Sequence, residues 1–200
     1  FAINVKGVDL PEVEPRLQAG LALGYMVDPH GADHIVNFHD HVYMSDATMD
    51  EVRPEGFIQT FEPEEMNPQK TALFKAEHVK AVIPNCLVVC SMPFIPMTNV
   101  QIAEITAAVT GWDTGLMELM RIGERVLTMD RLFNVRNGLT AEDDRLPQRF
   151  FQPKTDGPVT KGLDPEKMEK AKKYYYTLMG WDAETGIPLP EKLEDLGIQL

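Results

Sequence analysis

The sequence predicts a mainly α-helical protein. Apolar residues recur at helical spacing in several segments, and no run alternates with the period of two that marks a half-buried strand. Asn-Pro and Asp-Pro pairs precede these segments, and Gly residues follow them. With 200 residues, of which 44% are hydrophobic and 25% are charged, the chain is long enough to bury a sizeable core and has an ordinary globular composition.

The N-terminal third carries the weaker helical signals. Residues 1–15 contain two prolines and are expected to be extended or loop. An apolar stripe predicts a helix over residues 16–27, and the acidic residues 44–66 are expected to form a surface excursion. Gly31 is expected to open a short helix whose apolar positions are Ala32, Ile35, Val36 and Phe38.

The remaining two thirds carry clearer start and stop signals. Asn67-Pro68 is a good helix start, because Pro is favoured at the first helical position. Thr98 and Gln101 form a capping box, and Gly111 fits a helix end. The predicted helices cover residues 67–82, 98–111, 116–135, 165–178 and 190–196.

The charge of the chain limits its partners. Asp and Glu number 31 against 19 Lys and Arg, which gives a net charge of −12. Such a surface repels phosphate backbones, so we expect no nucleic-acid partner, and no basic amphipathic helix offers itself to a membrane. The chain has only 2 Cys and shows no charged segment before an apolar run. We therefore expect no signal peptide and a reducing, cytoplasmic compartment.

Residues 81–103 contain no charged side chain. This stretch is long enough to span a bilayer, but prolines and amides interrupt it, and these would be left unsatisfied in lipid. We expect a deeply buried segment of a soluble protein with irregular backbone at its centre. Either a bound cofactor or a combination of protein and water would satisfy the buried backbone groups.

Two cysteines lie in this stretch, Cys86 and Cys90. A buried thiolate is costly unless a metal or cluster takes its charge, so these residues are candidate ligands. The alternative is a pair of apolar thiols packed in the core. Two cysteines cannot complete a four-ligand site, so further ligands would lie outside this chain.

Four of the 5 histidines fall close together, at His30, His34, His39 and His41. Carboxylates stand among them, and imidazoles flanked by carboxylates suit metal ligation or acid–base chemistry. A solvated polar loop is the alternative. The cluster supports a second hypothesis, a small helical metal-dependent hydrolase. A third hypothesis is a non-enzymatic helical docking module, which an exposed apolar face around residues 81–103 would favour.

Several longer motifs are spread over most of the chain. They are Gly24-Tyr25, Gly31-Ala-Asp-His34, Thr110-Gly-Trp-Asp-Thr-Gly115, Glu118-Leu-Met-Arg-Ile-Gly-Glu-Arg125, Asp130-Arg-Leu-Phe-Asn-Val-Arg136, Asp143-Asp-Arg-Leu-Pro-Gln-Arg-Phe150 and Gly180-Trp-Asp182. In this set of motifs the chain resembles the C-terminal third of the tungsten-containing aldehyde ferredoxin oxidoreductases.

The resemblance implies an oxidoreductase that oxidises aldehydes to carboxylic acids and passes electrons to ferredoxin or a similar acceptor. It implies a tungsten (or molybdenum) bis-pyranopterin cofactor and one [4Fe–4S] cluster, both shared with an N-terminal region. Residues 1–200 would be the helical C-terminal portion, inactive alone, with a candidate subdivision near residue 66 into an irregular pocket segment and a helical bundle. The remainder of the enzyme and a small aldehyde are the expected partners.

The resemblance also implies site residues. Three cluster cysteines precede this region in the family, and the fourth ends an Asp-x-Leu-Gly-Leu-Cys-like motif. That motif corresponds to residues 85–90, so Cys90 is the expected metal ligand, and Val88 and Val89 stand where the family has Gly-Leu. The expected cofactor contacts are Asn85, Leu87, Val89 and Cys90. His34 matches the family's pocket histidine and is the expected catalytic residue, although the motif leaves the register between His34 and His41 open.

Overall fold

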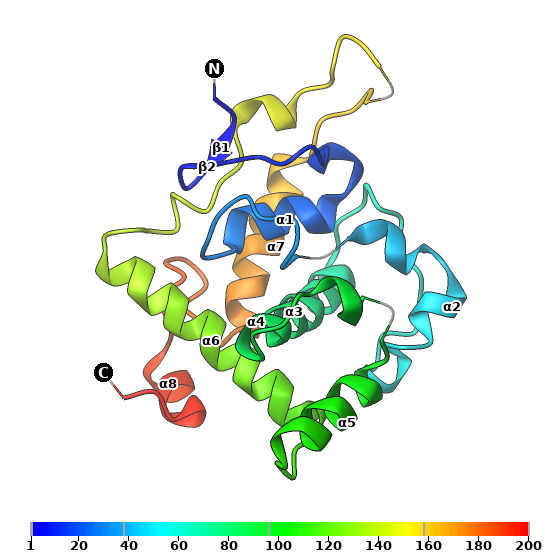
Figure 1. Ribbon diagram of the computed structural model, residues 1–200. Coiled ribbons are helices and arrows are strands. Elements are labelled where there is room, and N and C mark those ends of the chain that lie inside the picture. Colours follow the sequence, from blue (N-terminus) through cyan, green and yellow to red (C-terminus); the bar gives the residue numbers. More distant parts are fainter. Residues whose placement is uncertain (1, 38, 96, 158, 200) are drawn as a thin grey trace.

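The computed structural model describes residues 2–37, 39–95, 97–157 and 159–199, and it is mainly α-helical, as the sequence predicts (Figure 1). Two short strands, β1 and β2, pair as an antiparallel hairpin at Asn4–Val5 and Val8–Asp9. Short 3₁₀ helices cover Pro15–Leu17, Asp40–Met44, Arg53–Glu55, Met92–Phe94 and Gln148–Phe151. The α-helices are α1 (Ala19–Val27), α2 (Asp46–Met49), α3 (Pro68–Ala81), α4 (Ile83–Cys86), α5 (Asn99–Thr110), α6 (Leu116–Arg136), α7 (Pro165–Leu178) and α8 (Pro190–Leu196).

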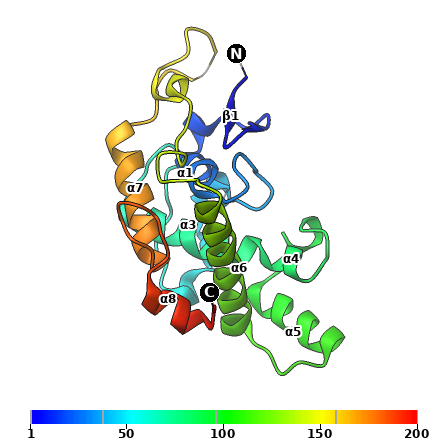
Figure 2. The ribbon, with the colours of Figure 1, turned by 90° about the vertical axis from the view of Figure 1, so that its left-hand side faces the viewer.

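Helix α3 is the centre of the arrangement, because it contacts α1, α6 and α7. Figure 2 shows α7 and α8 on one side of α6, and α4 and α5 on the other. The main core lies around α1, α3 and α7, and a smaller cluster joins α4, α5 and α6. None of the described helices is long and apolar enough to cross a membrane. The main core takes residues from both sides of residue 66, and the subdivision there stays a prediction.

The capping signals of the predicted helices have the expected geometry. The Asn67 side chain accepts the N–H of Lys70 at 2.9 Å and begins α3. Thr98 and Gln101 form the capping box of α5, which ends at Gly111 with a left-handed φ of 74°. The helices predicted over residues 67–82, 98–111, 116–135, 165–178 and 190–196 are confirmed within one or two residues at each end.

The short helix expected from Gly31 does not form, and this prediction is wrong. The Asp33 side chain accepts the N–H of Ile35 at 2.7 Å, a local bond that competes with helical hydrogen bonding. Gly31 has a φ of 104°, and a Cβ there would lie 2.5 Å from the carbonyl oxygen of Val5. The segment therefore follows turns and bends, and Phe38 lies outside the described residues.

The acidic segment 44–66 is more than a surface excursion, which corrects the second expectation. Met49, Val52, Phe61 and Met66 are buried and belong to the main core. They sit among charged residues at irregular intervals, so neither helical nor strand periodicity marks them.

A buried ion pair joins three parts of the molecule. The carboxylate of Asp40 accepts the N–H groups of Gly20 and Leu21, at 2.8 and 2.9 Å, at the N-terminus of α1. Gln18, at the N-cap of α1, provides no side-chain cap, so Asp40 supplies it from elsewhere in the chain. Asp40 also pairs with Lys70 of α3. Both side chains are fully buried, and this burial raises the pKa of Asp40 and lowers that of Lys70.

The ammonium of Lys70 completes the network. It donates to the carbonyl oxygens of Glu62, Pro63 and Glu65 at 2.8–2.9 Å. Three carbonyl oxygens and the Asp40 carboxylate thus surround the buried ammonium, which offsets the cost of removing this charge from water. The pair therefore joins α1, α3 and the turn at residues 62–65.

A second buried network surrounds Asp144. Its carboxylate pairs with Lys6 and with Arg131 of α6, each at 2.7 Å, and accepts the hydroxyl of Tyr176 of α7. The guanidinium of Arg131 also lies over the rings of Tyr176 and Trp181. The network joins the β1–β2 hairpin to α6 and α7.

The Asp40–Lys70 pair gives a first prediction. Asp40→Asn leaves a buried ammonium without its counter-ion, so we expect the free energy of unfolding to fall by about 3–5 kcal/mol. Urea unfolding at pH 7 measures the change. Asp50→Asn is the matched control, because it breaks an exposed ion pair with Arg53 and should cost at most ~0.5 kcal/mol. Equal losses in the two variants would contradict the structural role of the pair.

Candidate functional site

The cysteine segment lies at the surface of the described chain. Cys86 and Cys90 are both exposed and carry free thiols. Among the described residues of the uncharged stretch, the buried ones lie toward its two ends, as at Ile83 and Ile102, whereas Val88 is 91% exposed. The expectation of a deeply buried segment over residues 81–103 is therefore wrong for this chain by itself. A run without charges can be buried against another part of a protein as well as inside its own core.

The two thiols differ in their surroundings. The exposed Cys86 residue is still partly shielded from water, and this partial burial raises the pKa of its thiol, as does the nearby Asp130 carboxylate. A raised pKa disfavours the thiolate, which is the form that binds metal. Cys90 follows α4 at the point where the chain enters the exposed loop. Sequence spacing alone could not separate these two cysteines, both are exposed in the structure, and the assignment of Cys90 as the ligand stays a prediction.

The histidine segment follows turns instead of the short helix expected from Gly31. His30 is exposed, and its N–H is accepted by the side chain of Asp28 at 2.7 Å. His34 is half-buried, and its carbonyl oxygen accepts the Nε2–H of His39 at 2.8 Å. The ring of His39 also lies edge-on to the rings of His34 and His41, with centroids 6.1 and 5.8 Å apart.

His39 is a neutral imidazole with a defined tautomer. Burial lowers its pKa, and the neighbouring His41 and His34 add to the effect. Because the carbonyl oxygen of His34 is an acceptor, the ring proton lies on Nε2. Nδ1 therefore keeps a lone pair that can accept a proton or a hydrogen bond. His41 differs, since its Nδ1 donates to the side-chain oxygen of Gln18 at 3.1 Å.

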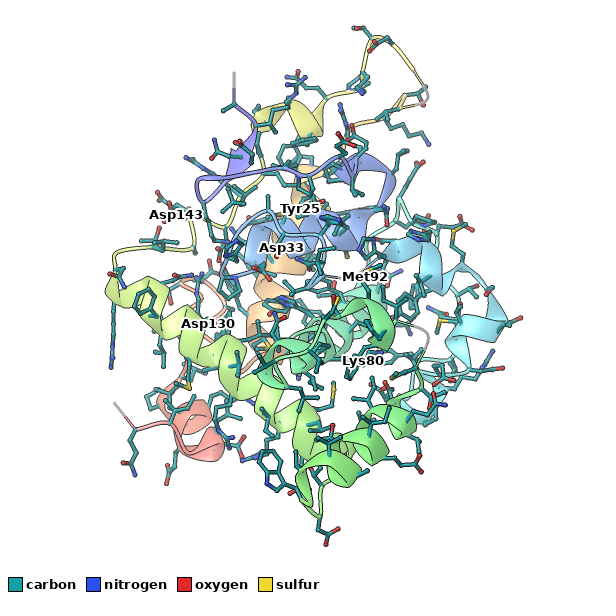
Figure 3. All side chains as sticks on the ribbon, in the orientation of Figure 1. Tyr25, Asp33, Lys80, Met92, Asp130 and Asp143 are labelled. Carbon is teal, nitrogen blue, oxygen red and sulfur yellow. The ribbon has the colours of Figure 1, made fainter. Side chains whose placement is uncertain are left out.

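His39 and His41 line a pocket of about 440 Å³, within the usual size of small-molecule sites. The pocket lies between the histidine segment, the end of α3 and the loop that follows Cys90, of which Ser91 and Met92 form part of the wall. Figure 3 labels Met92 and Lys80 at this place. His34 is not among the described residues that line this pocket, and it contacts His39 through its carbonyl oxygen and its ring.

The polar end of the pocket is a linked set of side chains. Lys80 pairs with Glu77 one turn earlier on α3, at 2.7 Å. Glu77 also takes part in a hydrogen bond with Tyr43, and burial raises the pKa of that phenol. Burial and the charge of nearby Glu77 raise the pKa of Glu55, which accepts the side-chain amide of Asn99 at 2.8 Å outside the pocket wall. The Lys80 and Glu77 side chains of the wall are thus paired with each other.

The sequence did not identify a third polar set, at His78. Its Nε2 lies 3.0 Å from the Asp28 carboxylate and its Nδ1 lies 2.9 Å from the Tyr175 hydroxyl. The three residues are buried and lie far apart in the sequence, on α3, at the end of α1 and on α7. Asp28 is the residue that also binds the N–H of His30, so the set anchors the start of the histidine segment. No local pattern could have shown this.

A larger hollow of about 710 Å³ lies elsewhere, between the β1–β2 hairpin and the residues before Gln148. Asp143 and Arg145 contribute to its wall, but no histidine or cysteine does. In Figure 3 Asp143 lies well away from Lys80 and Met92. The hollow lacks the residue types on which the site predictions rest.

Metal ligation can be tested on the donor set. Among the described residues, no group of three or more His, Cys, Asp or Glu side chains is arranged to hold a metal ion. The described residues therefore offer no metal site for the hypothesis of a metal-dependent hydrolase built on the His30–His41 cluster. A single exposed thiol, in contrast, fits the role of one ligand to a group whose other ligands lie elsewhere.

Comparison with known proteins gives the family. Residues 1–198 match the family model for aldehyde ferredoxin oxidoreductase, domains 2 and 3. The tungsten-containing aldehyde ferredoxin oxidoreductase of Pyrococcus furiosus is 31% identical over 99% of this chain, and that of Thermococcus kodakarensis is 30% identical over 99%. The chain spans 31% of the length of each.

One further curated protein and one solved structure extend the comparison. A Pyrococcus furiosus protein described as an aliphatic sulfonate oxidoreductase, WOR-like subunit, is 39% identical over 49% of this chain and 17% of its own length. Among solved structures, the active site complex BamBC of benzoyl coenzyme A reductase with 1,5 dienoyl-CoA has a TM-score of 0.64 and 19% identity. The match covers 98% of this chain and 33% of that one, and it shows a shared fold. The motif resemblance is thus confirmed, and the chain belongs to the aldehyde ferredoxin oxidoreductase family of oxidoreductases, where it corresponds to domains 2 and 3.

Proposed function

We propose that this chain is the helical part of a tungsten-dependent enzyme that oxidises aldehydes to carboxylic acids and passes the electrons to ferredoxin or a similar acceptor. The observation that carries the proposal is the match of residues 1–198 to domains 2 and 3 of the family. Oxidation of an aldehyde consumes water and releases two electrons and two protons. When bound, the pterin-held metal supplies the oxygen-transfer chemistry and the iron–sulfur cluster takes electrons singly.

Cys90 is the proposed cluster ligand of this chain. Its thiol is exposed, so it can reach a cluster held by another part of the enzyme without rearrangement of the helices. Asn85 and Val89 are exposed on the same turn, and Leu87 is half-buried beside them. We propose that these residues contact the cofactors, with the Asn85 amide available for a hydrogen bond to a pterin edge.

The turn that presents Cys90 has a defined backbone geometry. The N–H of Val89 bonds the carbonyl oxygen of Pro84 at 3.0 Å, and the N–H of Val88 bonds that of Asn85 at 3.1 Å. This pair of bonds is the Schellman motif, which ends a helix with one left-handed residue. That residue is Val88, with a φ of 57°, where glycine is normally favoured. The fixed turn sets the direction in which the chain reaches Cys90.

The surface around this turn is unusually apolar. Val88, Met92 and Ile95 are each more than half exposed, and Ile35 is 49% exposed across the pocket. A large apolar patch on the surface of a chain is typical of a region that another part of the protein or a partner covers. We propose that the remainder of the enzyme covers it, because the chain spans only 31% of its relatives. The docking hypothesis and the enzyme hypothesis then describe the same chain.

His39 is the proposed proton acceptor of the pocket. Its Nδ1 is unprotonated in the neutral ring, and its Nε2–H is held by the carbonyl oxygen of His34. A neutral imidazole can hold a proton released by the oxidation or orient the substrate carbonyl. His34, the residue predicted from the motif, would act through His39 by fixing the ring.

The ligand assignment is tested by substitution in the complete enzyme. We expect Cys90→Ala to lose the electron paramagnetic resonance signal of the reduced [4Fe–4S] cluster and at least one iron per chain. Cys86→Ala is the matched control, because it removes a thiol four residues away on the same segment and should leave the signal intact. An unchanged cluster in Cys90→Ala, or its loss only in Cys86→Ala, would refute the assignment.

The turn geometry gives an independent stability prediction. Val88→Gly removes a left-handed strain of about 1–2 kcal/mol, less the ~0.5–1 kcal/mol of extra chain entropy that glycine loses on folding. We expect a net rise in the free energy of unfolding of about 0.5–1 kcal/mol. Val89→Gly is the control, because Val89 does not have a positive φ and should lose stability. Urea unfolding distinguishes the two, and equal effects would contradict the proposed strain.

A further inference from the structure

Helix α6 presents an exposed patch that its own chain leaves uncovered. Met129 and Phe133 lie one turn apart on the helix and are 52% and 67% exposed, whereas Leu127 and Arg131, on another side of α6, are buried. Asp130 is also exposed and lies three positions before Phe133, so the two side chains are neighbours on the helix surface. Figure 3 labels Asp130 on α6. Met129, Asp130 and Phe133 form the α6 patch.

The α6 patch adjoins the segment that carries the two cysteines. Partial burial and the Asp130 carboxylate both raise the pKa of the Cys86 thiol, so this carboxylate lies near the thiol. One turn further along α6, the side-chain amide of Asn134 donates to the carbonyl oxygen of Pro29 at 2.8 Å. This side of the helix therefore also meets the start of the histidine segment. A part of the enzyme that covers the Cys90 turn would reach the α6 patch as well.

Asp130 has no cationic partner among the described residues. Partial burial raises the pKa of its carboxyl, the charge of Asp28 raises it further, and no cation or hydrogen-bond donor opposes the two effects. The neighbouring basic residues of α6 are bound elsewhere. Arg125 donates to the backbone of α8 at 2.7 Å, and Arg131 pairs with Asp144 at 2.7 Å.

Glu124, earlier on the same helix, is a carboxylate that the fold shields and also balances. Its oxygens meet the ammonium groups of Lys75 at 2.8 Å and Lys192 at 3.0 Å. Burial alone would raise the pKa of Glu124, but the two lysines lower it. Asp130 lacks an equivalent cation, so we expect its counter-charge in the part of the enzyme that covers it.

We propose that an arginine from the remainder of the enzyme docks on the α6 patch, with its guanidinium paired to the Asp130 carboxylate and stacked on the ring of Phe133. This inference rests on one element of the proposed function, the covering of the Cys90 turn by the remainder of the enzyme. Covering an unpaired carboxylate is costly, and a charge-assisted hydrogen bond offsets that cost. Arginine fits better than lysine, because a planar guanidinium can pair with a carboxylate and stack on an aromatic ring.

The arginine reagent phenylglyoxal tests this pairing in the complete enzyme, with peptide mass spectrometry to locate the modified residues. We expect Asp130→Asn to raise the modification rate of one arginine outside residues 1–200 at least about tenfold, because a hydrogen bond to a charged group stabilises the paired state by that factor or more. Asp130→Glu keeps the charge and should keep most of the protection. Asp113→Asn is the matched control, since it makes the same change at an exposed carboxylate just before α6 and should leave the rate unchanged.

An unchanged arginine pattern in Asp130→Asn would overturn the proposal. So would a gain confined to arginines within residues 1–200, such as Arg136, a gain spread over many arginines, or an equal gain in Asp113→Asn. The modification rates depend on neither aldehyde turnover nor the cofactors, so the two proposals fail separately. An enzyme that oxidises no aldehyde but shows the expected gain loses the proposed reaction and keeps the pairing. An enzyme that oxidises aldehydes without the gain loses the pairing alone.

Discussion

The buried carboxylate of Asp40 is the constraint on which the site depends. It caps the N-terminus of α1 and pairs with Lys70 of α3, so the backbone at residue 40 is fixed against both helices. His39 and His41 are its immediate neighbours in the chain. Because a buried charge tolerates little displacement from its partners, these two histidines are held beside the pocket without a helix or strand of their own.

Local signals predicted most of the helices, since caps and apolar periodicity act over a few residues. The helices beginning at Pro68, Asn99 and Pro165 follow from the side chains of Asn67, Thr98 and Asp164. The helix predicted after Gly31 does not form, because hydrogen bonds from side chains to nearby backbone groups compete with it. An apolar pattern in the sequence does not reveal such bonds. The predicted burial of residues 81–103 was wrong for a different reason, since a sequence does not say which part of a protein will cover an uncharged stretch.

The sequence predicted candidate site residues but not their arrangement. The resemblance implied Cys90 and His34, which stay predictions, and the structure shows that His39 and His41 line the pocket while the carbonyl oxygen of His34 accepts a hydrogen bond from His39. The sets around Asp144 and His78 could not be foreseen, because their partners are separated by long stretches of chain. Long-range pairs of this kind need a fold before they can be recognised.

The exposed loop between Asn85 and Ile95 contributes no side chain to the main core. The helices can therefore reach their final packing while that loop still faces water. If the proposed cluster binds at this loop, its insertion or loss would leave the main core of the helices unchanged. Folding of the chain and loading of the cluster would then be separate events.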